Sequence, residues 1–307
     1  METLNSIDCF VRSADAGSFA GAARHMGLTP AAVGKNVAKL ETSLGVRLFQ
    51  RSTRSLTLTE PGQRFLNEVR GGLVILRSAV ANLASAGGQP AGTLKVSMGT
   101  VFGRHYVMPM LGEFLARYPG IVPDWHFDNR QVDLIGEGFD AAIGGGFELP
   151  PGVVARKLGP AHRVLVASPA FIAAAPRIRS PGDLALLDGI SVRSPQTGRV
   201  RPAALRNRAG DEAPLTWRVR MTMSDADASC RAAMMNLGVA LVSMPHALPY
   251  LEDGRLTRVL PDWYVDGGSI SIYHAGQTLL PAKTRAFVDF VVDGFKQQRL
   301  AARLSAR

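Results

Sequence analysis

The first 58 residues alternate apolar and polar positions in a way that predicts three short helices and a hairpin. Apolar residues recur every three or four positions over Leu4–Ala16, which is typical of a helix with one buried face. A second short helix is expected between residues 18 and 27, because a serine can cap its start and a glycine its end. Thr29 followed by Pro30 predicts the start of a third helix, which runs to about residue 44. Two short helices around a tight turn are typical of a helix-turn-helix.

Residues 48–58 predict a small hairpin, or wing, with its tip at residues 51–54. A long helix is expected over Glu60–Ser85, because its apolar residues alternate in steps of three and four. We interpret these apolar residues as the contact surface, or seam, along which two such helices pair. The alternative is that they are buried in a globular core. Two consecutive glycines predict a soft spot at 71–72, and residues 86–90 predict a linker. The series consists of Leu66, Val69, Leu73, Leu76, Val80 and Leu83.

From Gly92 onward the pattern changes to short strands separated by helices. Alternating strands and helices predict parallel sheets with helices on both faces. About 200 residues exceed what one such sheet needs, so two subdomains are expected. A turn is expected at 99–100, a helix through residues 108–115 and a final helix over 282–296. The expected strands lie at residues 93–98, 124–127, 141–143, 163–167, 189–193, 219–222, 239–243 and 269–274.

Charge and cysteine content narrow the class of protein. The formal net charge of +10 favours an anionic partner such as nucleic acid. Two distant cysteines, Cys9 and Cys230, argue against a secreted disulfide framework and favour the reducing cytoplasm. The N-terminus does not resemble a signal peptide, and no apolar run is long enough for a membrane span, so no membrane partner is expected. The histidines have no metal-like spacing and no catalytic constellation is evident, so we expect no metal, no cofactor and no enzymatic activity.

The third helix carries the clearest functional signal. At about 100° per residue, Val33 and Val37 fall on one side of it, while Lys35 and Lys39 fall on the other with Asn36 on the flank. One face can therefore pack against the protein while the other faces a negatively charged partner. The alternative is a basic face that is merely solvated.

A duplex is the partner that best fits these residues. Small side chains at the start of the helix allow close approach to a groove, the amide can pair with adenine, and lysines can reach guanine or phosphate. Arginines at the hairpin tip can follow the DNA backbone or the minor groove. The candidate DNA-binding residues are Ser18, Thr29, Pro30, Ala31, Ala32, Lys35, Asn36, Lys39, Arg51, Thr53 and Arg54.

Several motifs of this chain resemble those of the LysR-type transcriptional regulators. They are GSFAGAA at 17–23, LTPAAVGKNVAKLE at 28–41, LGVRLFQR at 44–51, LTEPG at 58–62 and LPAKTR at 280–285. The resemblance implies a winged helix-turn-helix, a dimerising linker helix, and an α/β effector domain similar to periplasmic binding proteins. It also implies dimers or tetramers and a small, often acidic, effector. Gly34 departs from the serine that the family often has there, which removes a hydroxyl contact and weakens the helix slightly.

The resemblance places the effector in a cleft between two α/β subdomains, and strand ends in such sheets are where ligands bind. Polar side chains there could orient a ligand, and an arginine could balance the charge of a carboxylate. For any single one of these residues, an ordinary role in a turn or cap is the alternative. The candidate effector-binding residues are Thr100, Val101, Phe102, Asn129, Gly145, Arg193, Ser194, Thr197, Thr222 and Ser224.

The sequence thus predicts an α/β protein with three parts and a regulatory role. Residues 1–59 are expected to bind double-stranded DNA and residues 60–90 to form the linker helix and hinge. Residues 91–300 are expected to bind the effector, with one subdomain at about 91–161 and 268–300 and the other at about 162–267. The rival hypotheses are a solute-binding module, disfavoured by the basic helix, and an enzyme with a DNA anchor, which no catalytic group supports.

Overall fold

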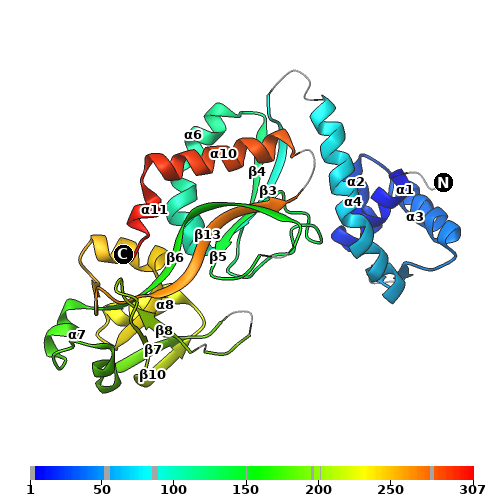
Figure 1. Cartoon of the computed structure of the whole chain (residues 1–307). Coiled ribbons are helices and arrows are strands. Elements are labelled where there is room, and N and C mark those ends of the chain that lie inside the picture. The colour runs from blue at the N-terminus through cyan, green and yellow to red at the C-terminus, as the bar shows by residue number, and fades with distance from the viewer. Residues whose placement is uncertain are drawn as a thin grey trace. The chain divides into compact units, whose positions relative to one another are not determined.

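The computed structural model of the chain contains two compact units (Figure 1). One comprises residues 1–87 with 133–138, and the other comprises residues 88–132 with 139–307. No helix in the described part of the chain is long and apolar enough to cross a membrane. The structure describes residues 4–51, 56–84, 89–149, 151–194, 197–200, 202–276 and 280–307, without the side chains of 51, 74, 75 and 77–84.

The N-terminal unit begins with the three predicted helices, and each predicted cap is present. The Ser18 hydroxyl accepts a hydrogen bond from the Gly21 amide at 3.0 Å, and the Thr29 hydroxyl accepts one from the Ala32 amide at 3.2 Å. Gly27 ends the second helix in the left-handed conformation with φ +64°. The elements are α1 (Leu4–Ala16), α2 (Phe19–Met26), α3 (Pro30–Leu44), β1 (Phe49–Arg51), β2 (Leu56–Leu58) and α4 (Glu60–Ala84).

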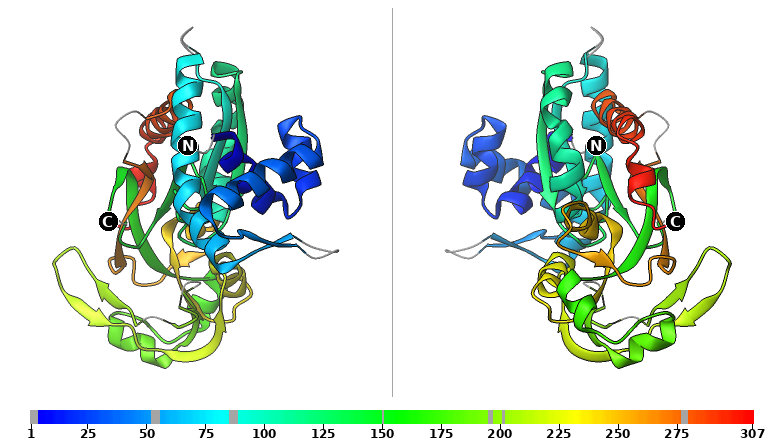
Figure 2. Two further views of the ribbon diagram at one scale, coloured as in Figure 1. Left: turned by 90° about the vertical axis from the view of Figure 1, so that its right-hand side faces the viewer. Right: turned by 90° about the vertical axis from the view of Figure 1, so that its left-hand side faces the viewer.

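These elements surround one small core. Phe10 is completely buried, and its ring centroid lies 5.3 Å from that of Phe49 at the base of the hairpin. The hairpin pairs Phe49 with Leu58 and extends away from the helices (Figure 2). Its predicted tip, with Thr53 and Arg54, lies outside the described residues. The core therefore fixes the base of the wing against α1.

The first half of helix α4 does not form the helix–helix seam that the sequence predicts. Leu66 and Leu73 are buried in the core of the N-terminal unit, with 4% and 6% exposure, whereas Leu76 is 46% exposed. The predicted helix-pairing series is thus wrong for its first half, which belongs to a globular core instead. The side chains of Val80 and Leu83 lie outside the described residues. The helix continues through both central glycines, so the soft spot produces no break in it.

The C-terminal unit is built on one mixed sheet rather than on separate parallel sheets. Its strands lie in the order β10-β7-β11-β6-β13-β5-β3-β4, and β12 pairs with β6. Pairing is parallel on both flanks, but β6 and β13 run antiparallel to their neighbours. The strands are β3 (Gly92–Met98), β4 (Ile121–Phe127), β5 (Ala141–Gly145), β6 (Val153–Ala167), β7 (Asp188–Val192), β8 (Ala204–Arg206), β9 (Glu212–Pro214), β10 (Arg218–Met223), β11 (Val239–Ser243), β12 (Thr257–Arg258) and β13 (Val265–Ala275).

The sheet divides the C-terminal unit into two lobes. Lobe I contains β3, β4 and β5 together with the helices that pack against these strands. Lobe II contains β7, β10 and β11 together with the helices that pack against them. The long strands β6 and β13 run through both lobes (Figure 1). A helix begins at Thr100, where a turn was expected, and contains a π-helical segment. The helices are α5 (Thr100–Phe102), η1 (Gly103–Val107), η2 (Met108–Met110), α6 (Leu111–Arg117), α7 (Pro169–Ala174), η3 (Pro181–Leu186), α8 (Ala226–Met234), α9 (Met244–Glu252), α10 (Ala282–Gln297) and α11 (Leu300–Arg303).

A shielded ion pair joins helix α10 to the sheet of lobe I. Lys283 Nζ lies 2.7 Å from Asp140 Oδ2, and the two side chains are only 17% and 8% exposed. The same carboxylate accepts a hydrogen bond from the Lys95 amide at 2.9 Å. The pair therefore holds the start of α10 beside β3.

Breaking this pair should destabilise the C-terminal unit. We expect Asp140→Ala to lower its free energy of unfolding by about 3 kcal/mol, because the shielded Lys283 ammonium loses its counter-charge and keeps only its hydrogen bond to the Thr93 carbonyl. Asp289→Ala removes the exposed Asp289–Arg156 pair and should have a much smaller effect. Urea unfolding followed by circular dichroism measures both, and equal losses in the two variants would contradict the prediction.

Candidate nucleic-acid interface and ligand cavity

Helix α3 presents the two faces that its sequence predicts. Val33 and Val37 are completely buried and Leu40 is 1% exposed, whereas Lys35 and Lys39 are exposed. Because the two lysines are four residues apart, they lie one turn apart on the same side of the helix. The exposed face of α3 is therefore cationic along two successive turns.

The start of α3 provides a surface that a groove can approach closely. Thr29, Pro30 and Ala31 are exposed, and Ala32 is half-buried. Ser18 is half-buried, and its hydroxyl caps α2. This end of α3 therefore presents small side chains and a capped helix start.

Asn36 lies differently from the lysines. It is half-buried, and its side chain hydrogen-bonds Cys9 of α1, which partly offsets the rise in the Cys9 pKa caused by burial. Among the wing candidates, the backbone of Arg51 closes β1, while its side chain and residues 53 and 54 lie outside the described part of the chain.

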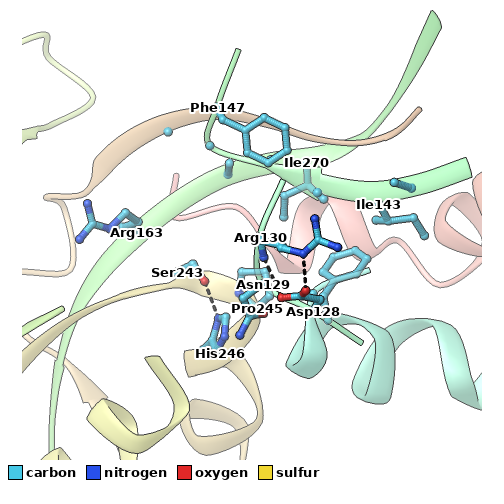
Figure 3. Close-up of a pocket in the computed structure, with 18 of the residues that line it drawn as sticks. Asp128, Asn129, Arg130, Ile143, Phe147, Arg163, Ser243, Pro245, His246 and Ile270 are labelled. Atoms are coloured by element: carbon cyan, nitrogen blue, oxygen red, sulfur yellow. Dashed lines mark hydrogen bonds and ion pairs between the residues drawn. The ribbon is translucent and has the colours of Figure 1, made fainter. Parts of the chain in front are cut away.

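The candidate ligand site is a cavity of about 450 Å³ between the two lobes (Figure 3). That volume suits a small molecule. Lobe I contributes the ends of β3, β4 and β5, and lobe II contributes the end of β11 and the start of α9, with β6 and β13 between them. The lining residues are Ser97, Gly99, Phe102, Asp128, Asn129, Arg130, Ala142, Ile143, Gly144, Gly145, Gly146, Phe147, Ala161, Arg163, Ser243, Pro245, His246, Val265, Asp266, Gly267, Ile270 and Tyr273.

The polar groups of the cavity are held by specific contacts. Asn129 Oδ1 accepts a hydrogen bond from the Thr100 amide at 3.1 Å and thereby caps the helix after β3. Arg130 Nε lies 2.8 Å from Asp128 Oδ2. Ser243 Oγ lies 2.6 Å from His246 Nδ1 (Figure 3). These contacts restrain the polar atoms of a lining that mixes apolar and polar side chains.

His246 is a neutral hydrogen-bonding group in this cavity. Its burial lowers the pKa below the ordinary value of 6.5, although Asp225 and Asp227 act in the opposite direction. The imidazole is therefore uncharged at neutral pH. Charge in the lining comes instead from Arg130 and Arg163 and from Asp128 and Asp266.

The predicted effector-binding residues fall into three groups. Phe102, Asn129 and Gly145 line the main cavity. Arg193 and Ser194 line a smaller cavity of about 200 Å³, which shares Arg163 and Ser243 with the main one. The residues that line neither of these two cavities are Thr100, Val101, Thr197, Thr222 and Ser224.

Sequence reasoning missed most of the lobe II side of the cavity. Ser243 ends a predicted strand and His246 follows three residues later, so the rule that ligands bind at strand ends could have found both. Asp128 and Arg130 flank the predicted Asn129 in the same way. Arg163 gave no such signal, because it lies within β6 and reaches the cavity only through the course of that strand.

Comparison with known proteins identifies both parts of the chain. Residues 4–63 match the model of the bacterial regulatory helix-turn-helix proteins of the lysR family, and residues 87–296 match that of the LysR substrate binding domain. Two curated relatives are a transcriptional repressor from Pseudomonas aeruginosa and a transcriptional regulator from Xanthomonas campestris. They are 30% and 33% identical over 97% and 94% of this chain and 93% and 84% of their own lengths.

A solved structure extends the likeness to the fold of the full chain. The virulence activator AphB of Vibrio cholerae, described as a member of the LTTR protein family, superposes with a TM-score of 0.60 at 26% identity. The match covers 95% of this chain and 99% of AphB. These relatives are regulators of transcription rather than enzymes.

Two glycines of the N-terminal unit should respond in opposite ways to an added methyl group. At Gly34 a Cβ would lie 3.7 Å from the nearest atom of Phe19, which is ordinary contact. We expect Gly34→Ala to raise the free energy of unfolding by about 0.5–1 kcal/mol, because alanine favours the helix interior. At Gly62 a Cβ would lie 2.1 Å from the Leu48 carbonyl oxygen, so Gly62→Ala should destabilise by about 1–3 kcal/mol. Thermal unfolding measures both, and destabilisation by Gly34→Ala would contradict the packing described for α3.

Proposed function

Because this chain belongs to the LysR family of transcriptional regulators, we propose that α3 reads operator DNA while the cavity between the lobes senses a small carboxylate. The observation that carries the DNA-binding role is the exposed pair Lys35 and Lys39 on the face of α3 opposite its buried residues. In this proposal residues 1–59 bind DNA, 60–90 link and dimerise, and 91–300 bind the effector.

The proposed interface assigns each part of α3 a role. Lys35 and Lys39 contact phosphate or guanine, and the small residues at the start of the helix allow it to enter the major groove. Arg51, Thr53 and Arg54 at the wing contact the DNA backbone. Two copies of the chain pair, as dimers or within tetramers, and present their α3 helices to half-sites about one helical turn apart or a multiple of it. Such a protein works in the cytoplasm, which two buried, unpaired thiols suit.

The cavity favours an effector with an apolar body and an acidic end. Phe102, Phe147 and Tyr273 supply aromatic walls. Arg163 supplies positive charge, and the neutral imidazole of His246 can hydrogen-bond an oxygen without repelling other groups. Effector binding would favour one arrangement of the lobes over another and so shift the population of regulator conformations.

DNA binding should weaken with salt, and the lysines of α3 should account for part of that dependence. Each lysine that contacts a phosphate adds about 0.9 to the slope of log affinity against log salt, so Lys35→Ala and Lys39→Ala should each lower it by about one. Lys296→Ala removes an exposed lysine of the C-terminal unit and should leave the slope unchanged. Fluorescence anisotropy with DNA from upstream of the coding region measures this. If DNA affinity does not change with salt, or if the lysine variants have the same salt dependence as the wild type, α3 does not bind DNA as proposed.

Carboxylates that enter the cavity should stabilise the folded protein. A screen of aliphatic and aromatic acids by thermal shift should find ligands that raise Tm, since a hundredfold excess over Kd contributes about 2.7 kcal/mol. Arg163→Gln should abolish the shift, and Arg231→Gln, which changes an exposed arginine of lobe II, should not. The amide of each active acid is the neutral control. A shift as large with the amide as with the acid would contradict recognition of charge.

A further inference from the structure

The last residues of the chain connect the two lobes on the side of the β6–β13 crossing away from the cavity. After α10, Arg299 adopts φ +50°, a left-handed conformation that turns the chain into α11. Helix α11 then lies close to β6, because a Cβ on Gly159 would be 3.4 Å from Ala301 Cα. Leu300 and Leu304 are 1% and 0% exposed, so this segment is packed rather than lying loose on the surface.

Polar contacts then join this segment to lobe II. The Arg303 guanidinium forms two hydrogen bonds from Nη2 to the Glu252 carboxylate at the end of α9, at 2.8 and 3.0 Å. Arg258 Nη1 donates to the Ala306 carbonyl at 3.0 Å. Arg307 Nε donates to the Tyr264 hydroxyl at 2.9 Å. We call residues 300–307 the C-terminal strap, because they begin next to α10 of lobe I and end on residues of lobe II.

One contact of the strap requires a neutral histidine. The Ala306 amide donates to Nδ1 of His162 at 2.9 Å, and His162 is 3% exposed. Burial lowers the pKa of His162 below 6.5. Of the charged groups around it, Asp266 favours protonation, while the cations Arg307, Arg258 and Lys157 oppose it. Protonation would fill the Nδ1 lone pair and place a fourth cation among these three, so the contact is lost as pH falls through the lowered pKa.

The strap and the cavity meet at the same two strands. Arg163 and Val265 are partners in the β6–β13 ladder and line the cavity, whereas the adjacent His162 and Tyr264 contact the strap. The pleat explains this separation, because consecutive side chains of a strand point to opposite faces. Asp266, the ladder partner of His162, departs from it, since it lines the cavity and also lies 3.6 Å from Arg307 of the strap. The ladder changes register between Asp266 and Ser269, so the crossing contains an irregularity at this level. Rotation of one lobe relative to the other here would disturb both sets of contacts.

We infer that the C-terminal strap fixes the relative arrangement of the lobes while His162 is neutral, and that its release in acid allows them to move. The strap thus controls the width of the ligand cavity without touching a ligand. His162 is a positioning residue in this scheme. The docking contacts are independent of DNA binding, so the experiment can succeed or fail separately from the proposed regulatory function.

Amide exchange in the full-length protein tests strap docking. Loss of one buried hydrogen bond should accelerate exchange of the residue 304–307 amides by about tenfold beyond the intrinsic pH effect as pH falls from neutral through the lowered pKa of His162. His162→Gln retains an acceptor that does not titrate and should abolish this pH dependence. Arg303→Met should accelerate exchange at both pH values. Lys296→Met, which breaks an exposed ion pair on α10, is the matched control and should behave as the wild type.

Spin labels test whether the strap governs the lobes. Labels at Glu113→Cys on α6 and Ala185→Cys on η3 report the distance between lobes I and II, and both native cysteines are buried. We expect a shifted or broadened distance distribution for Arg303→Met at both pH values and for the wild type in acid, but not for His162→Gln in acid. If the amide exchange of residues 304–307 changes neither with pH nor in Arg303→Met, the docking scheme is wrong. A released strap with an unchanged distance distribution would overturn control of the lobes.

Discussion

The antiparallel pairing of β6 with β13 is the interaction on which the C-terminal unit depends. Within the described residues, these two strands belong to both lobes, and their ladder runs from Val153 opposite Ala275 to Arg163 opposite Val265. The cavity and the C-terminal strap both lie against this ladder, and a buried hydrogen bond from the Tyr106 hydroxyl to the Pro245 carbonyl joins the lobes directly. One face of the crossing lines the cavity with Arg163, and the other receives the C-terminal strap at His162. A change on one face is therefore transmitted through backbone that both faces share.

In the N-terminal unit, a single hydrophobic core likewise determines more than one functional feature. The burial of Val33 and Val37 determines which way Lys35 and Lys39 face, because side chains on opposite sides of one helix cannot turn independently. Leu66 and Leu73 of α4 pack into the same core, so α4 and the recognition helix share one hydrophobic cluster. Any movement of the first half of α4 is thus expected to carry α3 with it. This packing gives a physical route by which the linker helix could orient the DNA-reading surface.

Local signals were enough to predict the N-terminal helices and the orientation of α3. Caps, left-handed glycines and a proline at the first helical position act within a few residues of one another, so a sequence window contains the whole interaction. The same reasoning failed for α4. A heptad-like apolar series fits a helix seam and a globular core equally well, and only the position of α1 decides that Leu66 is buried inside its own unit.

In the C-terminal unit, the sequence by itself determined the alternation of strands and helices and placed three of the proposed cavity residues, Phe102, Asn129 and Gly145. Only the tertiary structure decided that β6 and β13 join both lobes in one mixed sheet and that Arg163 and His246 meet in one cavity. Strand ladders connect residues that are distant in sequence, and a local pattern of apolar positions carries no information about the partner strand or its register. Long-range strand pairing therefore determines which side chains meet in the cavity between the lobes. The orientation of the DNA-facing helix α3, in contrast, follows from its own residues.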